Sequence, residues 1–485
     1  MINYQDATAM ADAVRHKEVT PLELVQTAIS KAKELNPQLN AIVSTRYEEA
    51  FEEAKNRDFS GLPFGGVPIF IKDLGQELTG MPATSGSALF QNNISKITST
   101  YVKRLQDLGF IILGKSNVPE FGFKNISDSK ANGPVNLSFD PSRNAGGSSG
   151  GAATLITSGV TTISAASDGG GSIRIPASFN GLIGLKPSRG RIPTGPTSFR
   201  SWQGASVHFA LTKSVRDTKT LLYHLQDCQM EGPFPLPKLS EKDLFQTPLK
   251  PLKVALLTQD WHGNAFSDHV NQALNKAETF LVSQGHEVAP IKDLPLDMEA
   301  LIDSYYFMNA AETAAMFDQI EEAIGRPVEK TDMETMTWAI LQAGQELPAK
   351  DYSRIISAWD TYSAIMSQFL TDYDILITPA THDIAPKHGQ LDPDPALREK
   401  LAQAEVYSSK EQLQLVKSMF TKGLALNPYT PLANLTGLPA LSLPLYLVQD
   451  KYPLGVQFMA AKGREDLLLN LAEQFEAAGC FEMKN

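Results

Sequence analysis

The sequence is poor in cysteine and has no long apolar run. Cys228 and Cys480 are the only cysteines among 485 residues. Two cysteines are too few for a disulfide framework or a cysteine-based zinc motif. No stretch approaches the roughly 18–20 apolar residues that a membrane-spanning helix needs, and the first residues carry no basic segment followed by an apolar core, as a secretory signal would. These absences predict a reduced, soluble, cytoplasmic protein.

Basic charge and histidine are also scarce. Lysine and arginine number 43 against 54 acidic residues, for a net charge of −11, which disfavours a surface for nucleic acid or an anionic membrane. The eight histidines include no His-Glu-x-x-His pattern. His262 and His269 lie beside a polar loop, where exposed histidines are the simpler explanation. We therefore expect no metal site and no nucleic-acid or membrane partner.

The sequence does contain two clusters of glycine and serine. Residues 146–151 read Gly-Gly-Ser-Ser-Gly-Gly, and residues 167–176 read Ser-Asp-Gly-Gly-Gly-Ser-Ile-Arg-Ile-Pro. Upstream, the apolar run 65–71 predicts a buried strand that ends at Lys72. Taken alone, the first cluster is equally typical of a flexible linker. Together, the three segments supply a hydroxyl nucleophile, a second hydroxyl and a lysine, which suffice for acyl transfer without histidine.

The glycines of the second cluster predict a binding site for negative charge. Because glycine has no Cβ, consecutive backbone N–H groups can point at one spot. We expect the N–H groups of Gly169, Gly170, Gly171 and Ser172 to form an oxyanion hole for a tetrahedral intermediate. A glycine-rich structural turn is the alternative interpretation.

These clusters, with several other segments, resemble the amidase signature family of hydrolases over nearly the whole chain. The two clusters are highly specific to that family. The other segments that carry the resemblance are 21–24, 36–41, 114–121, 184–190, 435–440 and 455–457. Residues 201–217 resemble the branch that contains 6-aminohexanoate-cyclic-dimer hydrolases. Gly169 departs from the commonest family pattern, which has threonine at that position.

The resemblance implies a role for five residues. Ser172 would be the nucleophile, and Ser148, expected after a cis peptide bond, would pass its proton to Lys72, the general base. That base must be a neutral amine, so burial would have to lower its pKa from an ordinary value of about 10.4. Asp168 and Arg174 would hold the loop. The implied activity is hydrolysis of a small linear or cyclic amide through an acyl-serine, without a metal or an organic cofactor.

The resemblance also implies a fold. We expect one α/β domain over residues 1–485, with a mixed central sheet covered by helices on both faces. Residues 66–217 would be the catalytic signature core, and the proline-rich segment 231–252 a surface connection without packed structure. The variable helical region 300–425 would lie on the substrate side, with Met308 and Asn309 as candidate pocket residues. Nothing in the sequence specifies an interface, so a homo-oligomer stays open.

Two rival functions have specific signals in the sequence. Residues 109–116, Gly-Phe-Ile-Ile-Leu-Gly-Lys-Ser, match the spacing of the P-loop of a nucleotide-binding protein, although their bulky apolar centre favours a buried strand. The glutaminase half of a tRNA-dependent amidotransferase shares the Ser-Ser-Lys core but typically has glutamine where Ile175 stands. A non-enzymatic binding module would be expected to lack one of Lys72, Ser148 and Ser172.

Overall fold

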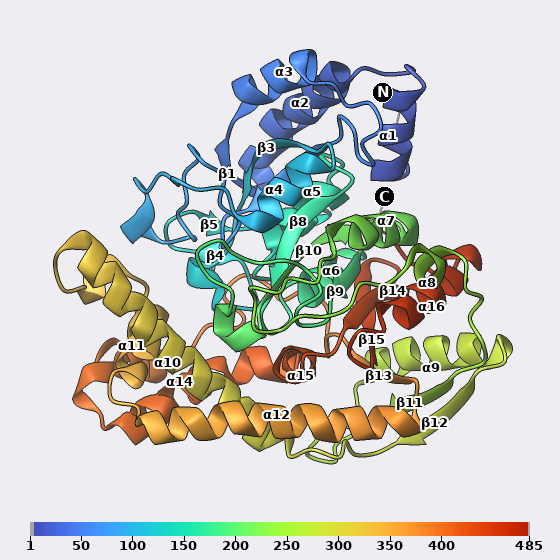
Figure 1. Ribbon diagram of the computed structural model, residues 1–485. Helices are drawn as coiled ribbons and strands as arrows, with labels where there is room; N and C mark the ends of the chain where they lie inside the picture. Colours follow the sequence, from blue (N-terminus) through green and yellow to red (C-terminus); the bar gives the residue numbers. More distant parts are fainter. Residues whose placement is uncertain (1–3, 484–485) are drawn as a thin grey trace.

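Residues 4–483 are described by a computed structural model, in which helices surround an eight-stranded and a three-stranded β-sheet, with two further two-stranded sheets, β4-β5 and β6-β7 (Figure 1). The strands are β1 (Ile42–Thr45), β2 (Pro68–Lys72), β3 (Ile111–Ser116), β4 (Asp128–Ser129), β5 (Gly133–Pro134), β6 (Asn136–Leu137), β7 (Asp140–Asn144), β8 (Ser164–Asp168), β9 (Ile183–Lys186), β10 (Val207–Thr212), β11 (Lys253–Leu257), β12 (Glu287–Ile291), β13 (Ile375–Pro379), β14 (Ala440–Val448) and β15 (Tyr452–Ala460). The large sheet has the order β12-β11-β13-β15-β14-β9-β10-β8, and a three-stranded sheet has the order β1-β3-β2. Both sheets mix parallel and antiparallel pairs.

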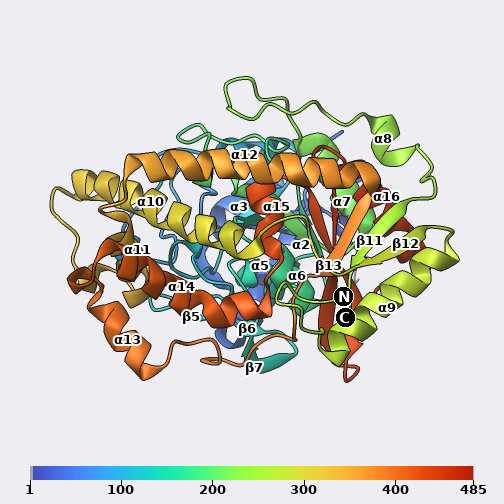
Figure 2. The same cartoon turned by 90° about the horizontal axis from the view of Figure 1, so that it is seen from below.

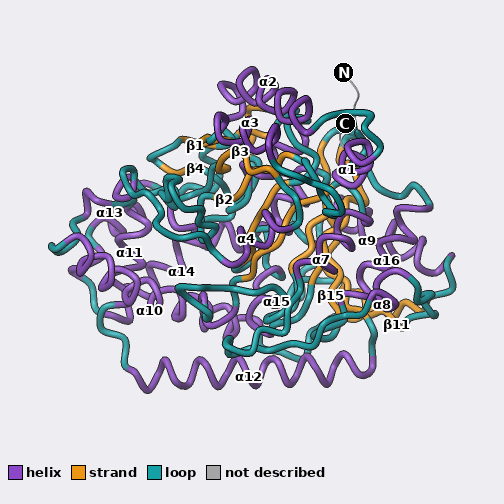
Figure 3. The backbone as a smooth tube through the Cα atoms, turned by 45° about the horizontal axis from the view of Figure 1, so that its top comes forward, coloured by secondary structure: helices purple, strands orange, loops and turns teal. Residues whose placement is uncertain are grey.

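Helices and loops make up the rest of the described chain, as the tube drawing shows (Figure 3). The helices are α1 (Ala7–Arg15), α2 (Pro21–Leu39), α3 (Tyr47–Asn56), α4 (Thr100–Asp107), α5 (Gly150–Thr157), α6 (Arg174–Asn180), α7 (Val215–Leu225), α8 (Glu241–Phe245), α9 (Asp268–Ser283), α10 (Met298–Ile324), α11 (Thr335–Gly344), α12 (Ala349–Asp372), α13 (Pro395–Ala402), α14 (Ser409–Leu426), α15 (Thr430–Thr436) and α16 (Glu465–Ala477). Within residues 4–483, none combines the length and the apolar character needed to cross a membrane.

The helices cover both faces of the large sheet, as the alternation of side chains along β15 makes clear. Gln457 of β15 accepts a hydrogen bond from Arg174 of α6 (2.6 Å). The ring of the next residue, Phe458, packs on the other face against Phe475 of α16, with ring centroids 5.7 Å apart. Helix α9 lies on that same face, since Phe280 also packs against Phe475; Figure 2 shows α6 and α9 on opposite sides of the strands. The predicted mixed sheet with helices on both faces is confirmed.

The smaller sheet carries the strand-end lysine. The buried run Pro68–Lys72 forms β2, which pairs in parallel with β3. Residues 111–116, whose apolar centre favoured a strand, form β3, and the ammonium of Lys115 in that strand is buried 3.5 Å from Asp73. A P-loop needs an open, glycine-rich loop at these positions. The P-loop interpretation of residues 109–116 is therefore wrong.

Two segments outside the catalytic core shape the rest of the molecule. The segment 231–252 contains a short helix, α8, which begins with a capping box at Ser240 and buries Leu244. The expectation that this segment has no packed structure is therefore wrong at α8: the prolines 233, 235 and 237 precede the helix rather than interrupt it. Residues 300–425 contain helices α10 to α14, which form a layer at the opposite end of the molecule from α2 and α3 (Figure 1).

Helix α6 meets the large sheet at a glycine, Gly184 of β9. A Cβ on Gly184 of β9 would lie 2.6 Å from the Cβ of Ala177 in α6 and 3.2 Å from the carbonyl oxygen of Ile173. In a closely packed interior, the methyl group of Ala177 and the backbone of Ile173 have no free space into which they could move to relieve this overlap. The distance between α6 and the sheet therefore depends on Gly184.

Replacing Gly184 by alanine should destabilise the protein by about 1–3 kcal/mol, the usual cost of overpacking a tight core. Urea denaturation followed by circular dichroism measures this change. Gly232→Ala is the matched control, because a Cβ there would have no neighbour closer than 3.5 Å. Equal denaturation midpoints for Gly184→Ala and the wild type would show that α6 can move away from the sheet without cost.

Candidate functional site

The amine of Lys72 lies at the end of β2 in the interior of the protein. Its Nζ donates hydrogen bonds to the hydroxyl of Ser148 (2.7 Å), the hydroxyl of Ser167 (2.9 Å) and the carbonyl oxygen of Ser167 (3.3 Å). The side chain is 0% exposed. The first glycine-serine cluster and the end of β8 thus enclose the amine, and the sequence expectation that Lys72 and Ser148 meet agrees with this geometry.

Burial controls the charge of this amine. Desolvation lowers the pKa of Lys72 to about 7, and the negative charge of Asp168 opposes that change without cancelling it. The backbone N–H of Lys72 donates to Gln76 Oε1 (2.6 Å), and Gln76 Nε2 donates to the carbonyl of Ala166 (2.9 Å), so Gln76 links β2 to β8. Sequence patterns indicated no role for Ser167 or Gln76. Ser167 could have been found from its place in the second cluster, whereas Gln76 gave no signal.

The two serines of the clusters reach one pocket. Ser148 follows a cis peptide bond from Gly147, as expected. Ser148 and Ser172 both line the pocket, and Ser172 is 8% exposed against 2% for Ser148. Among residues 4–483 no hydrogen bond joins the two hydroxyls. Ser148 is therefore in contact with Lys72, whereas Ser172 lies on the more open side of the pocket.

The backbone donors of the second cluster differ from the expected set at one position. The N–H of Gly171 donates to Asp168 Oδ1 (2.7 Å), so it does not face the pocket as a free donor. The N–H groups of Gly169, Gly170 and Ser172 have no acceptor within the described part of the chain, and all three residues line the pocket. Asp168 thus uses one glycine N–H to fix the loop, which leaves three donors rather than four.

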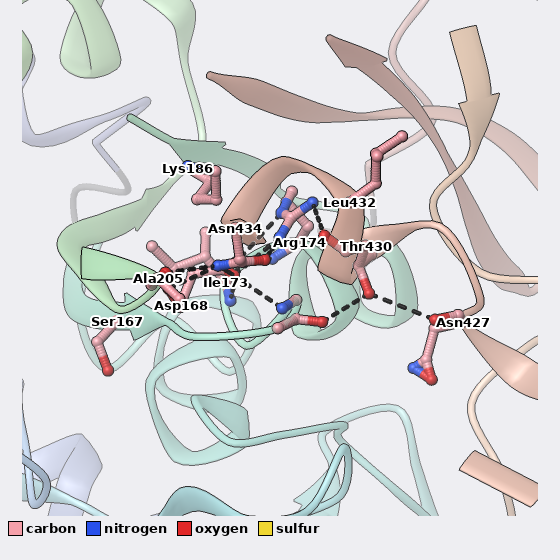
Figure 4. A network of polar contacts seen from close by, with 12 residues as sticks. Ser167, Asp168, Ile173, Arg174, Lys186, Ala205, Asn427, Thr430, Leu432 and Asn434 are labelled. Carbon is pink, nitrogen blue, oxygen red and sulfur yellow. Dashed lines mark hydrogen bonds and ion pairs between the residues drawn. The ribbon is translucent and has the colours of Figure 1, made fainter. Parts of the chain in front are cut away.

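Asp168 and Arg174 form a buried ion pair behind the loop (Figure 4). Arg174 donates to both carboxylate oxygens of Asp168 (2.9 and 2.8 Å), and also to Asn434 Oδ1 (2.7 Å) and the carbonyl of Thr430 (2.8 Å). Asn434 Nδ2 completes the network by donating to Asp168 Oδ1 (2.9 Å). Both charged side chains are 0% exposed, and the arginine holds the pKa of Asp168 far below its usual range despite burial. The network ties β8, α6, α15 and β15 together.

The pocket beside Ser172 is about 850 Å³ in volume, including its open mouth. Its described lining contains no aspartate, glutamate, lysine, arginine or histidine. The lining residues are Leu74, Phe121, Gly122, Phe123, Asn125, Ser148, Ser167, Gly169, Gly170, Ser172, Trp202, Ser206, Tyr305, Tyr306, Asn309, Ile340, Phe420, Leu424, Asn427 and Pro431. Burial raises the pKa of Tyr305 to about 12 and that of Tyr306 further, so both phenols are neutral near pH 7.

Of the two pocket residues expected from the sequence, Met308 and Asn309, one lines the pocket. Asn309 lines the pocket, but Met308, one position earlier on α10, is buried in the hydrophobic core. Adjacent helical residues point about 100° apart, and at this turn of α10 it is Met308 that packs into the core. The expectation that the lining comes from residues 300–425 is also incomplete, because Phe121, Phe123 and Trp202 precede that region.

Known proteins resemble this chain in sequence. The amidase family model matches residues 23–469. The chain is 37% identical to a lipoamidase from Enterococcus faecalis over 477 residues, which are 98% of this chain and 63% of that protein. It is 30% identical to a 6-aminohexanoate-cyclic-dimer hydrolase from Paenarthrobacter ureafaciens, covering 98% of this chain and 95% of that protein.

Solved structures agree with these matches. The structure of a 6-aminohexanoate cyclic dimer hydrolase complexed with substrate superposes with a TM-score of 0.87 at 29% identity, covering 99% of this chain and 98% of that chain. A bacterial aryl acylamidase of the amidase signature family shares the fold, with a TM-score of 0.83 at 23% identity, covering 98% and 96%. Because the family model matches most of its length, the chain belongs to the amidase signature family and is an amide-cleaving hydrolase.

Proposed function

We propose that this protein cleaves the C–N bond of a neutral amide through an acyl-serine formed on Ser172. The observation that carries the proposal is the 2.7 Å contact between Lys72 Nζ and Ser148 Oγ, at an amine whose pKa is lowered to about 7. A neutral amine at that distance can accept the Ser148 proton, and Ser148 can then take the proton of Ser172. Catalytic hydrogen bonds often shorten only when substrate binds. The absence of a hydrogen bond between Ser148 and Ser172 in the described structure agrees with this behaviour.

The reaction sequence follows from this arrangement. Ser172 Oγ attacks the amide carbonyl carbon while its proton moves through Ser148 Oγ to Lys72 Nζ. The carbonyl oxygen becomes an anion, which the N–H groups of Gly169, Gly170 and Ser172 can stabilise. The C–N bond then breaks, the proton returns to the leaving nitrogen, and the acyl group stays on Ser172. Water releases the acid by the same route.

The pocket favours a neutral substrate with apolar groups. A charged group would lose its hydration against walls of aromatic and aliphatic side chains, with no opposite charge among the described lining residues to replace it. The names of two relatives fit this class: one is called a lipoamidase, and the other acts on a cyclic dimer of 6-aminohexanoate, whose closure leaves no free amino or carboxyl end. A small linear or cyclic neutral amide is therefore the proposed substrate. The glutaminase half of a tRNA-dependent amidotransferase stays the second candidate, with no feature of the pocket in its favour.

Ser172→Ala and Lys72→Ala should each reduce kcat by at least about 1,000-fold, and Ser148→Ala by about 100-fold or more, because each removes one step of the proton route. Hydrolysis of p-nitroanilides with apolar acyl groups measures turnover. A fluorophosphonate probe followed by intact-mass spectrometry should give one adduct on the wild type and none on Ser172→Ala. Ser158→Ala, at the C-terminus of α5, is the control. Wild-type-like turnover in any of the three variants would remove that residue from the mechanism.

The pH profile tests the state of Lys72. Below its pKa the side chain is an ammonium and cannot accept a proton; above it the amine is free. kcat/KM should therefore rise with pH through about 7 and then level off. Lys186 provides a sharp control, because burial lowers its pKa to about 7 as well, while its Nζ donates to the carbonyl of Pro187 rather than to a serine. Lys186→Met should leave the midpoint unchanged, and a shifted midpoint would show that the profile does not report on Lys72 alone.

We also propose that Asp168 and Arg174 position the catalytic loop. Arg174→Met leaves a buried carboxylate without its cation and should cost about 3–5 kcal/mol of stability, measured by thermal denaturation. If the pair acts on the loop, the rate of fluorophosphonate labelling per folded molecule should also fall, and the double variant Asp168→Asn/Arg174→Met should recover part of the stability. Unchanged labelling in a destabilised Arg174→Met would reduce the pair to a structural role.

A further inference from the structure

Asn427 carries a buried donor that the proposed reaction does not use. The residue follows α14 directly and precedes α15, is 1% exposed, and lines the same pocket as Ser172. Its side-chain Nδ2 has no hydrogen-bond partner within residues 4–483. Of the pocket-lining residues, it is the one whose side chain holds a fully buried polar atom without a partner in the described structure. Leaving such a donor unpaired costs about 1–3 kcal/mol, so the position needs an explanation.

The direction of this donor is fixed by its neighbours. Asn125, which also lines the pocket, donates through Nδ2 to Asn427 Oδ1 (2.8 Å), which leaves Nδ2 of Asn427 as the end of the amide without a partner in the described structure. The backbone N–H of Asn427 donates to the carbonyls of Gly423 and Leu424, both at 3.2 Å, and its carbonyl accepts from Thr430 Oγ1 (3.4 Å). Figure 4 shows the side-chain amide turned away from the Arg174 network. The group is therefore held in place before any ligand arrives.

The Asn427 donor comes from a different segment of the chain from the proposed oxyanion donors Gly169, Gly170 and Ser172. Thr430 joins the backbones of the two segments: its hydroxyl donates to the carbonyl of Gly170 (2.7 Å) and, in a longer contact, to the backbone carbonyl of Asn427 (3.4 Å). A substrate whose scissile carbonyl faces Gly170 must bring a different acceptor to Asn427. The nearby walls, Tyr306, Phe420 and Leu424, are apolar or neutral, so an acceptor that reaches this point finds one polar partner in an otherwise apolar part of the pocket.

We infer that Asn427 is a specificity-determining residue: its Nδ2 donates a hydrogen bond to a second carbonyl oxygen of the substrate, remote from the bond that is cleaved. The preferred substrates are then neutral amides with a second carbonyl, such as linear or cyclic diamides, over monoamides of equal size. This inference rests on the proposed function, since it needs the scissile amide at Ser172. A site built to hydrogen-bond a substrate group discriminates against the analogue that lacks the group, because its own polar atom then stays unpaired.

The test compares matched substrates across variants of one side chain. A series of acetamidoacyl p-nitroanilides with increasing chain length supplies the second carbonyl, and alkanoyl p-nitroanilides of the same length lack it. In the wild type, the best acetamidoacyl substrate should exceed its alkanoyl match by about tenfold in kcat/KM. Asn427→Asp keeps the shape and the bond from Asn125 but presents an acceptor, and Asn427→Leu removes all polarity. Both variants should bring the ratio close to one while the alkanoyl substrates are still cleaved.

Asn309→Leu is the matched control for this ratio. Asn309 lines the same pocket, but its side chain already makes a hydrogen bond with Tyr305, so the preference for the second carbonyl should persist in this variant. A ratio that survives in Asn427→Asp or Asn427→Leu overturns the inference, as does a wild type that cleaves both series equally at every chain length. Fluorophosphonate labelling distinguishes failure of the proposed function from failure of this inference. If folded wild type is neither labelled nor able to cleave any substrate, the proposed function is refuted. If it is labelled normally but shows no preference for the acetamidoacyl substrates, only the role of Asn427 is refuted.

Discussion

The chemistry proposed for this protein depends on a lysine amine that is buried without a carboxylate in contact with it. Lys72 reaches the interior from the end of a fully buried strand and contacts hydroxyl and carbonyl oxygens, not a carboxylate. Serine dipoles satisfy its hydrogen bonds but replace only part of the hydration that an ammonium has in water. The neutral amine is therefore favoured, and its pKa falls to about 7. A surface lysine in the same sequence would be a cation and no base at all.

The neighbouring charge pair shows why the amine stays unpaired. Asp168 directly follows Ser167, whose hydroxyl contacts the Lys72 amine. The carboxylate of Asp168 nevertheless accepts its hydrogen bonds from Arg174, Asn434 and the N–H of Gly171. Guanidinium and carboxylate fit each other in a two-point contact and keep their charges even at zero exposure. The arginine thus neutralises much of the field that would otherwise hold the proton on Lys72. Of the two buried basic groups, Arg174 is paired with a carboxylate, whereas Lys72 contacts only hydroxyl and carbonyl oxygens, as the proposed proton transfer requires.

Two separate parts of the chain line the pocket, and the proposed function assigns the reaction to the first and the choice of substrate to the second. Lys72, Ser148, Ser172 and the backbone donors all come from the segment between β2 and α6. The far walls come largely from α10, α11, α14 and the residues before α15, in the layer at the opposite end of the molecule from α2 and α3 (Figure 1). Because these helices meet the core at residues such as Asn427 and Thr430, changes on them can alter the pocket while the catalytic groups stay in place. This arrangement suits a family in which one reaction serves different amides.

The sequence by itself determined the local features. Continuous apolar runs predicted β2 and β3, and the two glycine-serine clusters with the strand-end lysine made Lys72, Ser148 and Ser172 the candidate catalytic residues, because each of these signals lies within a few consecutive residues. Tertiary structure decided everything that joins distant segments. Four features depend on the direction in which a side chain or N–H group points after packing: the contacts of Lys72 with Ser167, the hydrogen bond from the Gly171 N–H to Asp168, the place of Asn309 rather than Met308 in the pocket, and the lack of a partner for Asn427 Nδ2 among the described residues. Sequence patterns give the period of an element but not its rotation against elements hundreds of residues away, and that rotation decides which polar atoms face the substrate.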